Sequence, residues 1–345
     1  MLKVAVFGAA GYGGVELIRL FLDHPEVQVT YLGGHSNVDE QLTDLYPHLL
    51  GDVDAKIGPS EVPAALEHAE LLFSALPHAV GAPLVAEALR AGAKVIDFSA
   101  DFRLHDVATY ERYYTQHPVP ELLAEAVYGL PELHREQIRT TRLLAVPGCY
   151  PTGATLALAP AVRAGLIEPQ GIIVDSKSGV SGAGRTSKAL TSMFCETTES
   201  VTAYNVGVHR HQPEMDQELG SFGAPVRVTF SPHLMPMARG ILTTAYGRLL
   251  PGVTQEQIED AYREFYREEP FVTVLPWGKQ PATKQVTGSN RCHVGLTTHE
   301  EAGLLIATSV IDNLIKGLSG AAVQCLNLMQ GWPETTALQR PAMWP

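Results

Sequence analysis

Residues 3–14 read KVAVFGAAGYGG, and this stretch decides the fold class of the N-terminal half. It opens with a short run of mostly apolar, partly β-branched residues, which is typical of a buried strand. A glycine-rich segment follows, and the apolar residues of 15–23 then recur with the period of a helix. Another strand-like run covers residues 27–32. A strand, a glycine turn, a helix and a second strand form the first unit of a doubly wound α/β sheet.

The spacing of the glycines in this turn has a physical reason. Gly8 allows the tight turn, Gly11 lets the backbone approach a pyrophosphate, and Gly14 lets the helix lie close to the strand. The start of the helix also offers unpaired N–H groups and a positive dipole end. We therefore predict that the turn, together with Tyr12 and Gly13, binds a dinucleotide; a tight turn without a ligand is the alternative.

The end of the second strand indicates which dinucleotide binds. Residues 32–37 read LGGHSN, and no acidic residue occurs before Asp39. Proteins that bind NAD usually carry an acid here for the ribose hydroxyls, so neutral or basic donors favour the 2′-phosphate of NADP. The sequence thus predicts NADP, with Ser36 and His35 as contacts. For each of these two residues, an ordinary surface turn is an equally good interpretation.

The rest of the first half continues the same alternation of helices and strands. The pattern predicts a helix over 61–68, a strand over 71–75, a helix over 79–91 and a strand over 94–99. Alternation of this kind predicts a Rossmann-type parallel sheet, with ligand-binding loops at the carboxyl ends of its strands. Leu76 and Pro77 follow one of these strands and are expected to line the cofactor groove.

The second half has a different pattern, with more strands and fewer helices between them. Strand-like runs cover 171–178, 226–231, 240–247, 271–275 and 292–298, and helices are expected over 255–268, 304–316 and 321–329. This order predicts an α+β domain with a mixed, largely antiparallel sheet. We expect an NADP-binding domain over 1–148, a catalytic and oligomerisation domain over 149–312, and C-terminal helices within 313–345 that pack on the first domain.

Composition narrows the class of protein. The 345 residues carry a net charge of −12, which argues against nucleic-acid binding through a basic surface. No apolar run approaches the roughly 18 residues that a membrane span needs. The N-terminus shows no signal-peptide pattern, so a cytoplasmic enzyme is expected. Four scattered cysteines without a CxxC or HExxH motif predict neither a disulfide framework nor a metal site.

One cysteine has a distinctive position. Cys149 lies in AVPGCYPTGA, residues 145–154, directly before a predicted helix. A thiol at a helix N-terminus is more easily ionised, and the N–H groups there can also hold an oxyanion. A buried apolar filler is the more common role for a single cysteine, so the assignment as a nucleophile needs a partner.

A candidate partner occurs about 60 residues later, in GVHRHQPE, residues 207–214. His209 and His211 flank Arg210, a combination that is expensive to bury and suits a site that binds an anion and moves a proton. A solvated basic loop and a metal site are the alternatives, although no third ligand is suggested nearby. Either histidine can be the acid/base, and we slightly favour His211.

Several motifs in order resemble those of the N-acetyl-γ-glutamyl-phosphate reductase family. Besides the glycine turn, they are SADFRL (99–104), PGCYPTG (147–153), SGVSGAGR (178–185), HRHQPE (209–214), HLMPMARG (233–240) and DNLIKG (312–317). The resemblance covers essentially the whole chain. It implies reduction of N-acetyl-glutamyl 5-phosphate to the semialdehyde with NADPH, through a thioester of Cys149, in arginine biosynthesis.

The resemblance also assigns further residues. It implies that the partner is a small acyl phosphate and that the protein forms a homodimer or homotetramer. Arg103 follows a strand end and is expected to bind the substrate phosphate, with a surface salt bridge as the alternative. Arg210, Arg239 and Glu214 are the other expected substrate contacts, and Asn313 is an expected cofactor contact. Ser181 and Gly182 lie in a glycine-rich loop that is expected to approach the cofactor, with a plain flexible loop as the alternative.

Four other interpretations stay open on the sequence. Aspartate-semialdehyde dehydrogenase shares the fold and the chemistry but lacks the His-Arg-His cluster. Related enzymes reduce a carrier-linked aminoadipyl phosphate in lysine biosynthesis. A non-catalytic NADP-binding regulator predicts a degraded cysteine and histidine set, whereas this chain retains both. The fourth interpretation is a cysteine-dependent hydrolase. Such an enzyme needs no dinucleotide site, so the N-terminal glycine turn argues against it.

Overall fold

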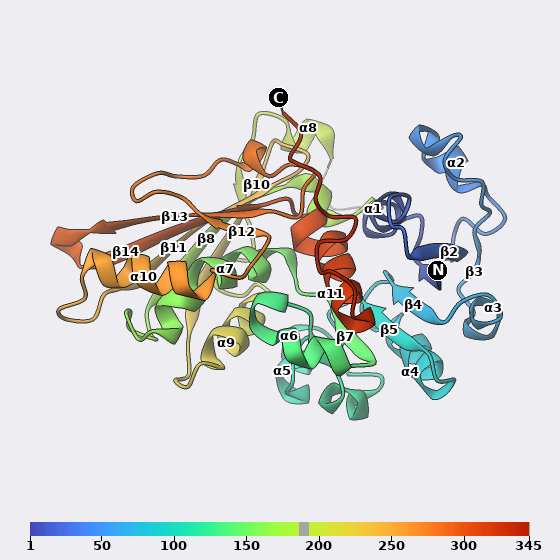
Figure 1. Ribbon diagram of the computed structural model, residues 1–345, viewed down its shortest axis with the longest axis horizontal. Helices are drawn as coiled ribbons and strands as arrows, with labels where there is room; N and C mark the ends of the chain where they lie inside the picture. Colours follow the sequence, from blue (N-terminus) through green and yellow to red (C-terminus); the bar gives the residue numbers. More distant parts are fainter. Residues whose placement is uncertain (186–192, 345) are drawn as a thin grey trace. The chain divides into compact units, whose positions relative to one another are not determined.

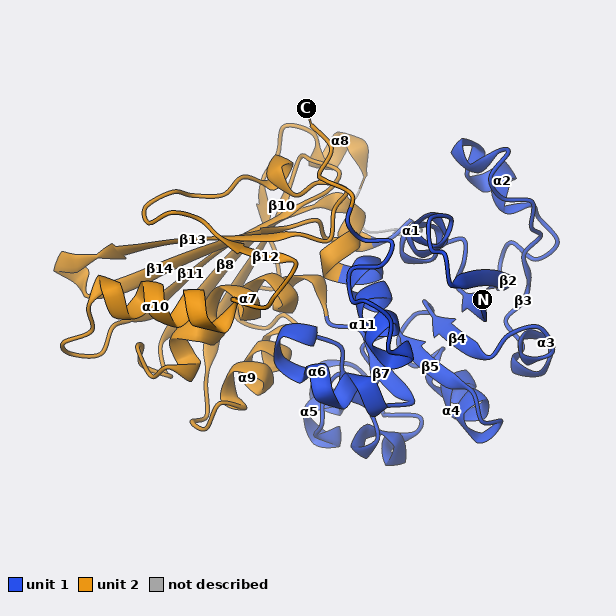
Figure 2. Cartoon of the chain, viewed as in Figure 1, with its two compact units in different colours: residues 1–147, 184–186, 318–339 blue, residues 148–183, 187–317, 340–345 orange. Residues whose placement is uncertain are grey.

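The computed structural model describes residues 1–185 and 193–344 (Figure 1). The chain divides into two compact units, coloured separately in Figure 2. Unit 1 consists of residues 1–147, 184–186 and 318–339, and unit 2 of residues 148–183, 187–317 and 340–345. None of the described helices has the length and apolar character needed to cross a membrane.

Unit 1 contains a seven-stranded sheet in which every paired strand is parallel. The order is β3-β2-β1-β4-β5-β7-β6. The strands are β1 (Leu2–Phe7), β2 (Val27–Gly34), β3 (Gly58–Pro59), β4 (Leu71–Ser74), β5 (Lys94–Asp97), β6 (Val127–Tyr128) and β7 (Leu143–Ala145). The strand order reverses beside β1, which is where doubly wound sheets bind ligands. The predicted Rossmann-type parallel sheet is thus confirmed.

Helices pack on the sheet of unit 1 and bury its apolar faces. They are α1 (Tyr12–Phe21), α2 (Leu42–Leu45), α3 (Val62–Leu66), α4 (Ala82–Arg90), α5 (Val107–Tyr113), α6 (Pro131–Thr140) and α11 (Gly320–Gln330), with 3-10 turns at Pro47–Leu49 and Pro120–Ala124. Phe7, Leu72 and Val95 come from three neighbouring strands and belong to one core cluster. Helix α11 is buried along almost its whole length and packs against α1 and α6.

Unit 2 contains a second seven-stranded sheet, in the order β12-β13-β14-β11-β8-β10-β9. The strands are β8 (Ile172–Gly179), β9 (Thr202–Ala203), β10 (Val228–Met235), β11 (Ile241–Arg248), β12 (Val272–Val274), β13 (Cys292–His299) and β14 (Leu304–Ile311). The β10–β8 and β12–β13 pairs are parallel, and the other pairs are antiparallel. This confirms the prediction of a mixed, largely antiparallel sheet.

The long helices of unit 2 gather on one face of its sheet (Figure 1). Helix α7 (Cys149–Arg163) packs on β11 and β14, and α9 (Gln212–Gly220) and α10 (Gln255–Phe265) pack on α7. The Tyr262 hydroxyl of α10 donates a hydrogen bond of 2.5 Å to the Ala157 carbonyl of α7. The shorter elements are α8 (Phe194–Thr197), 3-10 turns at Val180–Ala183, Thr283–Gln285 and Glu300–Ala302, and a π-helical turn at Ile315–Ser319.

One predicted element is wrong. Residues 304–316 were expected to form a helix, but 304–311 form strand β14, which pairs with both β11 and β13 along its length. A short, mostly apolar run fits a buried strand as well as a buried helix, so its period cannot separate the two. Gly303, with φ of 62°, ends the preceding turn and starts this central strand.

Candidate active site

The glycine turn between β1 and α1 leaves no room for a side chain at Gly8 or Gly14. Gly8 has φ of +77°, and a Cβ there would lie 2.3 Å from the carbonyl oxygen of Ala75. A Cβ on Gly14 would lie 2.4 Å from the carbonyl oxygen of Gly8. Gly11 caps α1 without a side-chain hydrogen bond. The first N–H groups of a helix lack intrahelical partners, so this cradle fits the pyrophosphate of a dinucleotide.

Two other predicted cofactor segments adjoin this turn within unit 1. The N–H of Gly8 donates to the Gly33 carbonyl at 2.8 Å, and His35 and Ser36 follow as exposed residues at the end of β2. On the other side of β1, the N–H of Ala75 donates to the Phe7 carbonyl at 2.9 Å, and Leu76 and Pro77 follow. The sheet therefore brings these segments to one edge, around the turn.

Arg103 is buried at the ends of β5 and β7, with only 6% of its surface exposed. Its Nε donates to the Val146 carbonyl at 2.7 Å, and its Nη2 donates to the Phe98 carbonyl at 2.8 Å. These bonds fix the plane of the guanidinium at the carboxyl edge of the sheet, where ligands bind in folds of this class.

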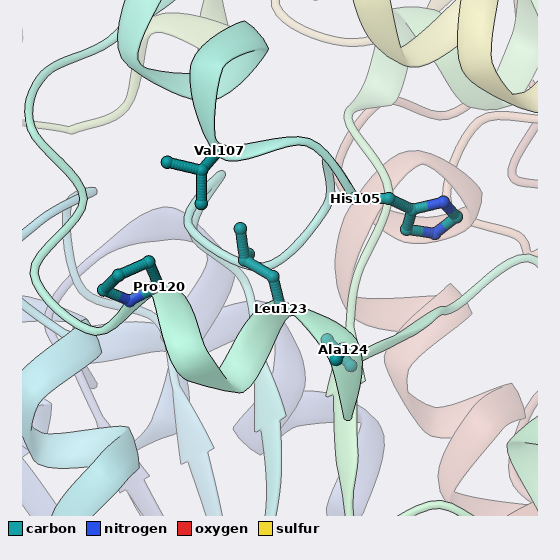
Figure 3. Close-up of a pocket in the computed structure, with 6 residues that line it drawn as sticks. His105, Val107, Pro120, Leu123 and Ala124 are labelled. Carbon is teal, nitrogen blue, oxygen red and sulfur yellow. The ribbon is translucent and has the colours of Figure 1, made fainter.

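A cavity of about 390 Å³ lies nearby in unit 1. Val107 and Leu123 face each other across it, and His105 lies at its edge (Figure 3). Its other lining residues are Pro120, Ala124 and Ala126. None of the site residues predicted from the sequence lines this cavity.

In unit 2, Cys149 is the first residue of α7 and is half-buried. Gly148 caps the helix without a side-chain hydrogen bond, and Cys149 therefore lies at the positive dipole end of α7. Such a position stabilises a thiolate. Gly317 packs against the cysteine, because a Cβ at 317 would lie 2.8 Å from the Cβ of Cys149.

His211 is the histidine that lies against this helix start. A Cβ on Gly148 would be 2.8 Å from its Nε2, so the imidazole ring covers the residue before Cys149. The same Nε2 lies 3.9 Å from Oε1 of Glu214, whose side chain is almost fully buried. His211 caps α9, and 12% of its side chain is exposed.

His209 occupies a different environment. It is 5% exposed, and its ring packs against those of Tyr150, Tyr204 and Phe230, with centroids 5.8, 5.5 and 5.2 Å away. Its Nδ1 accepts the N–H of His211 at 3.0 Å, which places the proton of the neutral ring on Nε2. Burial, reinforced by the charge of Arg210, lowers the pKa of His209 to about 4.

The remaining predicted residues of unit 2 fall into two groups. Asn313 is buried; its Oδ1 accepts the Gly240 N–H at 2.8 Å, and its Nδ2 donates to the Ser181 hydroxyl at 2.9 Å. Gly182 follows Ser181 in the same turn. Arg239 is half-exposed, with its Nη1 3.7 Å from Oδ2 of Asp312, whereas Arg210 is exposed.

Comparison with known proteins decides the family. Residues 3–141 match the family model "Semialdehyde dehydrogenase, NAD binding domain", and residues 149–313 match "Semialdehyde dehydrogenase, dimerisation domain". The chain is 48% identical over 345 residues to the N-acetyl-gamma-glutamyl-phosphate reductase of Pelotomaculum thermopropionicum, covering 99% of both chains. It is 49% identical over 346 residues to that of Magnetococcus marinus, covering 100% of this chain and 99% of the relative.

The chain belongs to the N-acetyl-γ-glutamyl-phosphate reductase family. The family resemblance inferred from the motifs is thus confirmed. The fold also matches a solved structure of aspartate-semialdehyde dehydrogenase with NADP from Candida albicans, with a TM-score of 0.73 and 16% identity. That match covers 96% of this chain and 98% of the other. At 16% identity, the match shows that this chain and that dehydrogenase share a fold.

Sequence reasoning missed two tyrosines at the site of this reductase-family chain. The Tyr204 hydroxyl donates to that of Tyr150 at 3.0 Å, and the Tyr150 hydroxyl donates to the His233 carbonyl at 3.3 Å. Burial raises the pKa of both phenols, that of Tyr204 to about 12. Tyr150 directly follows Cys149 and could have been noticed, whereas Tyr204 lies in a segment without a motif.

Proposed function

We propose that the protein reduces N-acetyl-L-glutamyl 5-phosphate to N-acetyl-L-glutamate 5-semialdehyde and phosphate, as a step of arginine biosynthesis. Full-length similarity to curated reductases of this name supports the substrate. The observation that carries the chemistry is the pairing at the start of α7: Cys149 begins the helix, and the His211 ring covers the residue before it.

The residues around the glycine turn fit NADP. The N-terminus of α1 would hold the pyrophosphate over Gly8, Gly11 and Gly14, and the exposed His35 and Ser36 would hold the 2′-phosphate. NADPH, when bound, supplies the hydride. The expected cofactor contacts of Ser181, Gly182 and Asn313 stay predictions.

Cys149 is the nucleophile in this proposal. Its thiolate attacks the carbonyl carbon of the acyl phosphate, a C–S bond forms, and phosphate leaves with the electrons of the C–O bond. The N–H groups at the start of α7 stabilise the thiolate and the oxygen that becomes negative during the attack. The product of this half-reaction is a thioester of Cys149.

His211 is the acid/base in this proposal. Hydride addition to the thioester carbon gives a thiohemiacetal oxygen, which His211 protonates. His211 then removes this proton as the C=O bond forms, the C–S bond breaks and the thiolate returns. His209 is less suited to the task, because it is buried and its Nδ1 already accepts a hydrogen bond.

The arginines are proposed to bind the substrate. Arg103 would take the phosphate, since backbone carbonyls hold its guanidinium in one orientation and a guanidinium can bind a phosphate through two N–H groups. Arg210 and Arg239 would take the carboxylate of the N-acetylglutamyl group.

We also propose that the protein is a cytoplasmic homodimer or homotetramer, with unit 2 at the interface. Ile173, Tyr246 and Ile306 are directly paired on β8, β11 and β14. They alternate with residues that face α7, such as Ser309, which donates to the Gly153 carbonyl. This row is only partly covered, and Ile173 is 46% exposed. Light scattering should give two or four subunits, and a monomer would contradict the proposal.

An assay in the reverse direction tests the reaction. The purified protein is given NADP, phosphate and N-acetylglutamate semialdehyde, and NADPH is followed by its absorbance, with aspartate semialdehyde in a parallel sample. We expect turnover with the acetylated substrate and at least about 100-fold less with the other. Comparable or faster turnover of aspartate semialdehyde would favour the alternative dehydrogenase.

A further inference from the structure

Asp312 is a fully buried carboxylate directly after β14, and the proposed mechanism does not use it. An ionised carboxylate is unfavourable in a protein interior unless hydrogen bonds or opposite charges compensate for the lost water. Its Oδ1 accepts the backbone N–H groups of Leu314 at 2.8 Å and Ile315 at 3.1 Å. Its Oδ2 accepts the N–H of Gly288 at 2.8 Å and lies 3.7 Å from Nη1 of Arg239. Four groups of unit 2 therefore converge on this one side chain.

The contacts of Oδ1 fix the start of the π-helical turn Ile315–Ser319. Asp312 acts as an N-cap residue does, because its short side chain accepts N–H groups two and three residues later that lack partners at the start of a turn. Its backbone carbonyl accepts the N–H of Gly317 at 3.0 Å, which is the i to i+5 bond of a π-helical turn. One residue therefore holds both the start of the turn and the glycine within it.

Gly317 brings this turn into contact with Cys149. A Cβ at 317 would lie 2.8 Å from the Cβ and 3.3 Å from the Cα of Cys149, and 3.3 Å from Cδ1 of Ile311 at the end of β14. The backbone of Gly317 thus fills the space between the end of this strand and the first residue of α7. A shift of the turn would change the packing on which the position of Cys149 depends.

We propose that Asp312 is a positioning residue that fixes the π-helical turn and, through Gly317, the position of Cys149. The carboxylate oxygen that accepts the two N–H groups carries this role, and the negative charge is not required for it. The inference rests on the proposed function, since it takes Cys149 as the nucleophile. It assigns Asp312 no contact with the substrate.

Two substitutions separate the oxygen from the charge. Asp312→Asn keeps an oxygen for the N–H groups of Leu314 and Ile315, because Asn caps helical turns about as well as Asp. It removes the charge beside Arg239 and one acceptor. Asp312→Ala removes the capping oxygen as well. The difference between the two variants therefore measures the contribution of the cap.

Asp216 provides a matched control in α9. Its side chain is 10% exposed, and its Oδ1 accepts the backbone N–H of Val228 at 2.8 Å. Its Oδ2 lies 3.1 Å from Nη1 of Arg227. Asp216→Asn thus changes a carboxylate that also combines a backbone hydrogen bond with an arginine, while the π-helical turn keeps its cap.

The experiment measures kcat and KM for N-acetylglutamate semialdehyde, with NADP and phosphate, in the full-length variants. For Asp312→Ala we expect kcat to fall about 10- to 100-fold with KM within about threefold of the parent, because a displaced nucleophile slows the chemical step more than it weakens binding. Asp312→Asn should keep kcat within about threefold, since its cap is retained. Asp216→Asn should keep both constants.

Hydrogen exchange of the Gly317 amide gives a second readout that needs no turnover. Its rate is taken relative to the Leu296 amide in the centre of β13, which corrects for a change in global stability. We expect the Gly317 amide to exchange at least about tenfold faster in Asp312→Ala, because the turn opens locally when its cap is lost. Asp312→Asn and Asp216→Asn should exchange this amide as the parent does.

Three results would overturn the inference. The first is full kcat or unchanged Gly317 exchange in Asp312→Ala. The second is a raised KM with unchanged kcat, which would indicate that Asp312 acts on substrate binding through Arg239. The third is an equal loss of kcat in Asp312→Asn and Asp312→Ala, which would indicate that the charge is required.

Two further outcomes are also decisive. If Asp312→Ala does not fold, Asp312→Asn decides, because retained kcat supports the capping oxygen and a lost kcat contradicts it. If the parent protein shows no turnover, the proposed function fails, whereas the exchange rate of the Gly317 amide still tests whether Asp312 holds the turn.

Discussion

The backbone N–H of His211 donates a hydrogen bond to Nδ1 of His209 over 3.0 Å. This bond distinguishes two histidines that the sequence cannot tell apart. It uses the acceptor nitrogen of His209, and burial keeps that ring neutral by lowering its pKa to about 4. His211 instead presents its Nε2 to Gly148 and Glu214. The relationship supports the proposal that His209 has a structural task and that His211 transfers the proton.

Replacement of each histidine should have a different result. His211→Asn should lower kcat by about 10²- to 10⁴-fold, the usual contribution of a general acid/base, and should flatten one limb of the pH profile of kcat. His209→Asn keeps a short acceptor for the His211 N–H and should lower kcat much less. Steady-state kinetics of the two variants checks this. A larger loss of kcat in His209→Asn would reverse the assignment.

The pKa of His209 predicts a pH dependence of stability. Its pKa is about 4 in the folded protein and 6.5 when unperturbed, so between these values only the unfolded chain binds the proton. The stability that accompanies the neutral ring is complete above pH 6.5 and is lost as the pH falls towards 4. Between pH 7.5 and 5, the difference in unfolding free energy between the parent and His209→Asn should shrink by about 2 kcal/mol.

The parent must be compared with His209→Asn because a second buried group, Asp97, changes the stability with pH in the opposite direction. Burial raises the pKa of Asp97 to about 7, so its contribution to stability is present below pH 3.8 and is lost as the pH rises through 7. The parent alone would show the sum of the two effects, whereas both proteins share Asp97. Urea unfolding at the two pH values gives the difference, and a pH-independent difference would contradict the buried neutral His209.

Gly317 should be required for the position of Cys149. In Gly317→Ala the new methyl group would lie 2.8 Å from the Cβ of Cys149, so one of the two must move. A displacement of this size at a nucleophile should lower kcat about 100-fold. Gly220→Ala, where the nearest atom lies at 3.5 Å, is the control and should keep its activity. Full kcat in Gly317→Ala would show that the site tolerates the shift.

Gly8 should be required both because its φ is positive and because a side chain at this position would clash with the backbone of Ala75. Gly8→Ala places a methyl group 2.3 Å from the Ala75 carbonyl at φ of +77°. Gly92→Ala meets no atom within 4 Å at φ of +90°, so it carries the same backbone strain without the clash. Fluorescence titration should show NADPH binding at least about tenfold weaker in Gly8→Ala and unchanged in Gly92→Ala. Equal affinities would exclude the turn as the cofactor cradle.

Elements of secondary structure could be predicted from the sequence where the local hydrophobic period alone determines whether a segment is a strand or a helix. The change from strand to helix period around residues 8–14 located β1, the turn and α1, because every part of that signal lies within one short segment. The run over 304–311 was misassigned, because neighbours on both sides, β11 and β13, make it a strand. Such pairing is a tertiary property that the local period does not contain.

The candidate site shows the same division. The sequence predicted Cys149 from its helix-start position and the His-Arg-His cluster from its residue types. The choice between the histidines was not, because the groups that decide it come from elsewhere: Phe230 from β10, and Gly148, which lies 66 residues before Glu214. These contacts form only when α7 and α9 pack together.

The central claim is that Cys149 carries the acyl group between two half-reactions. The most direct test mixes the protein with NADP and N-acetylglutamate semialdehyde in the absence of phosphate, then follows NADPH and the mass of the intact chain. We predict one NADPH formed per active site, an N-acetylglutamyl adduct on Cys149, and continued turnover when phosphate is added. Cys149→Ser should give neither the NADPH nor the adduct. Continuous turnover without phosphate and without an adduct, or an adduct on another residue, would contradict the account.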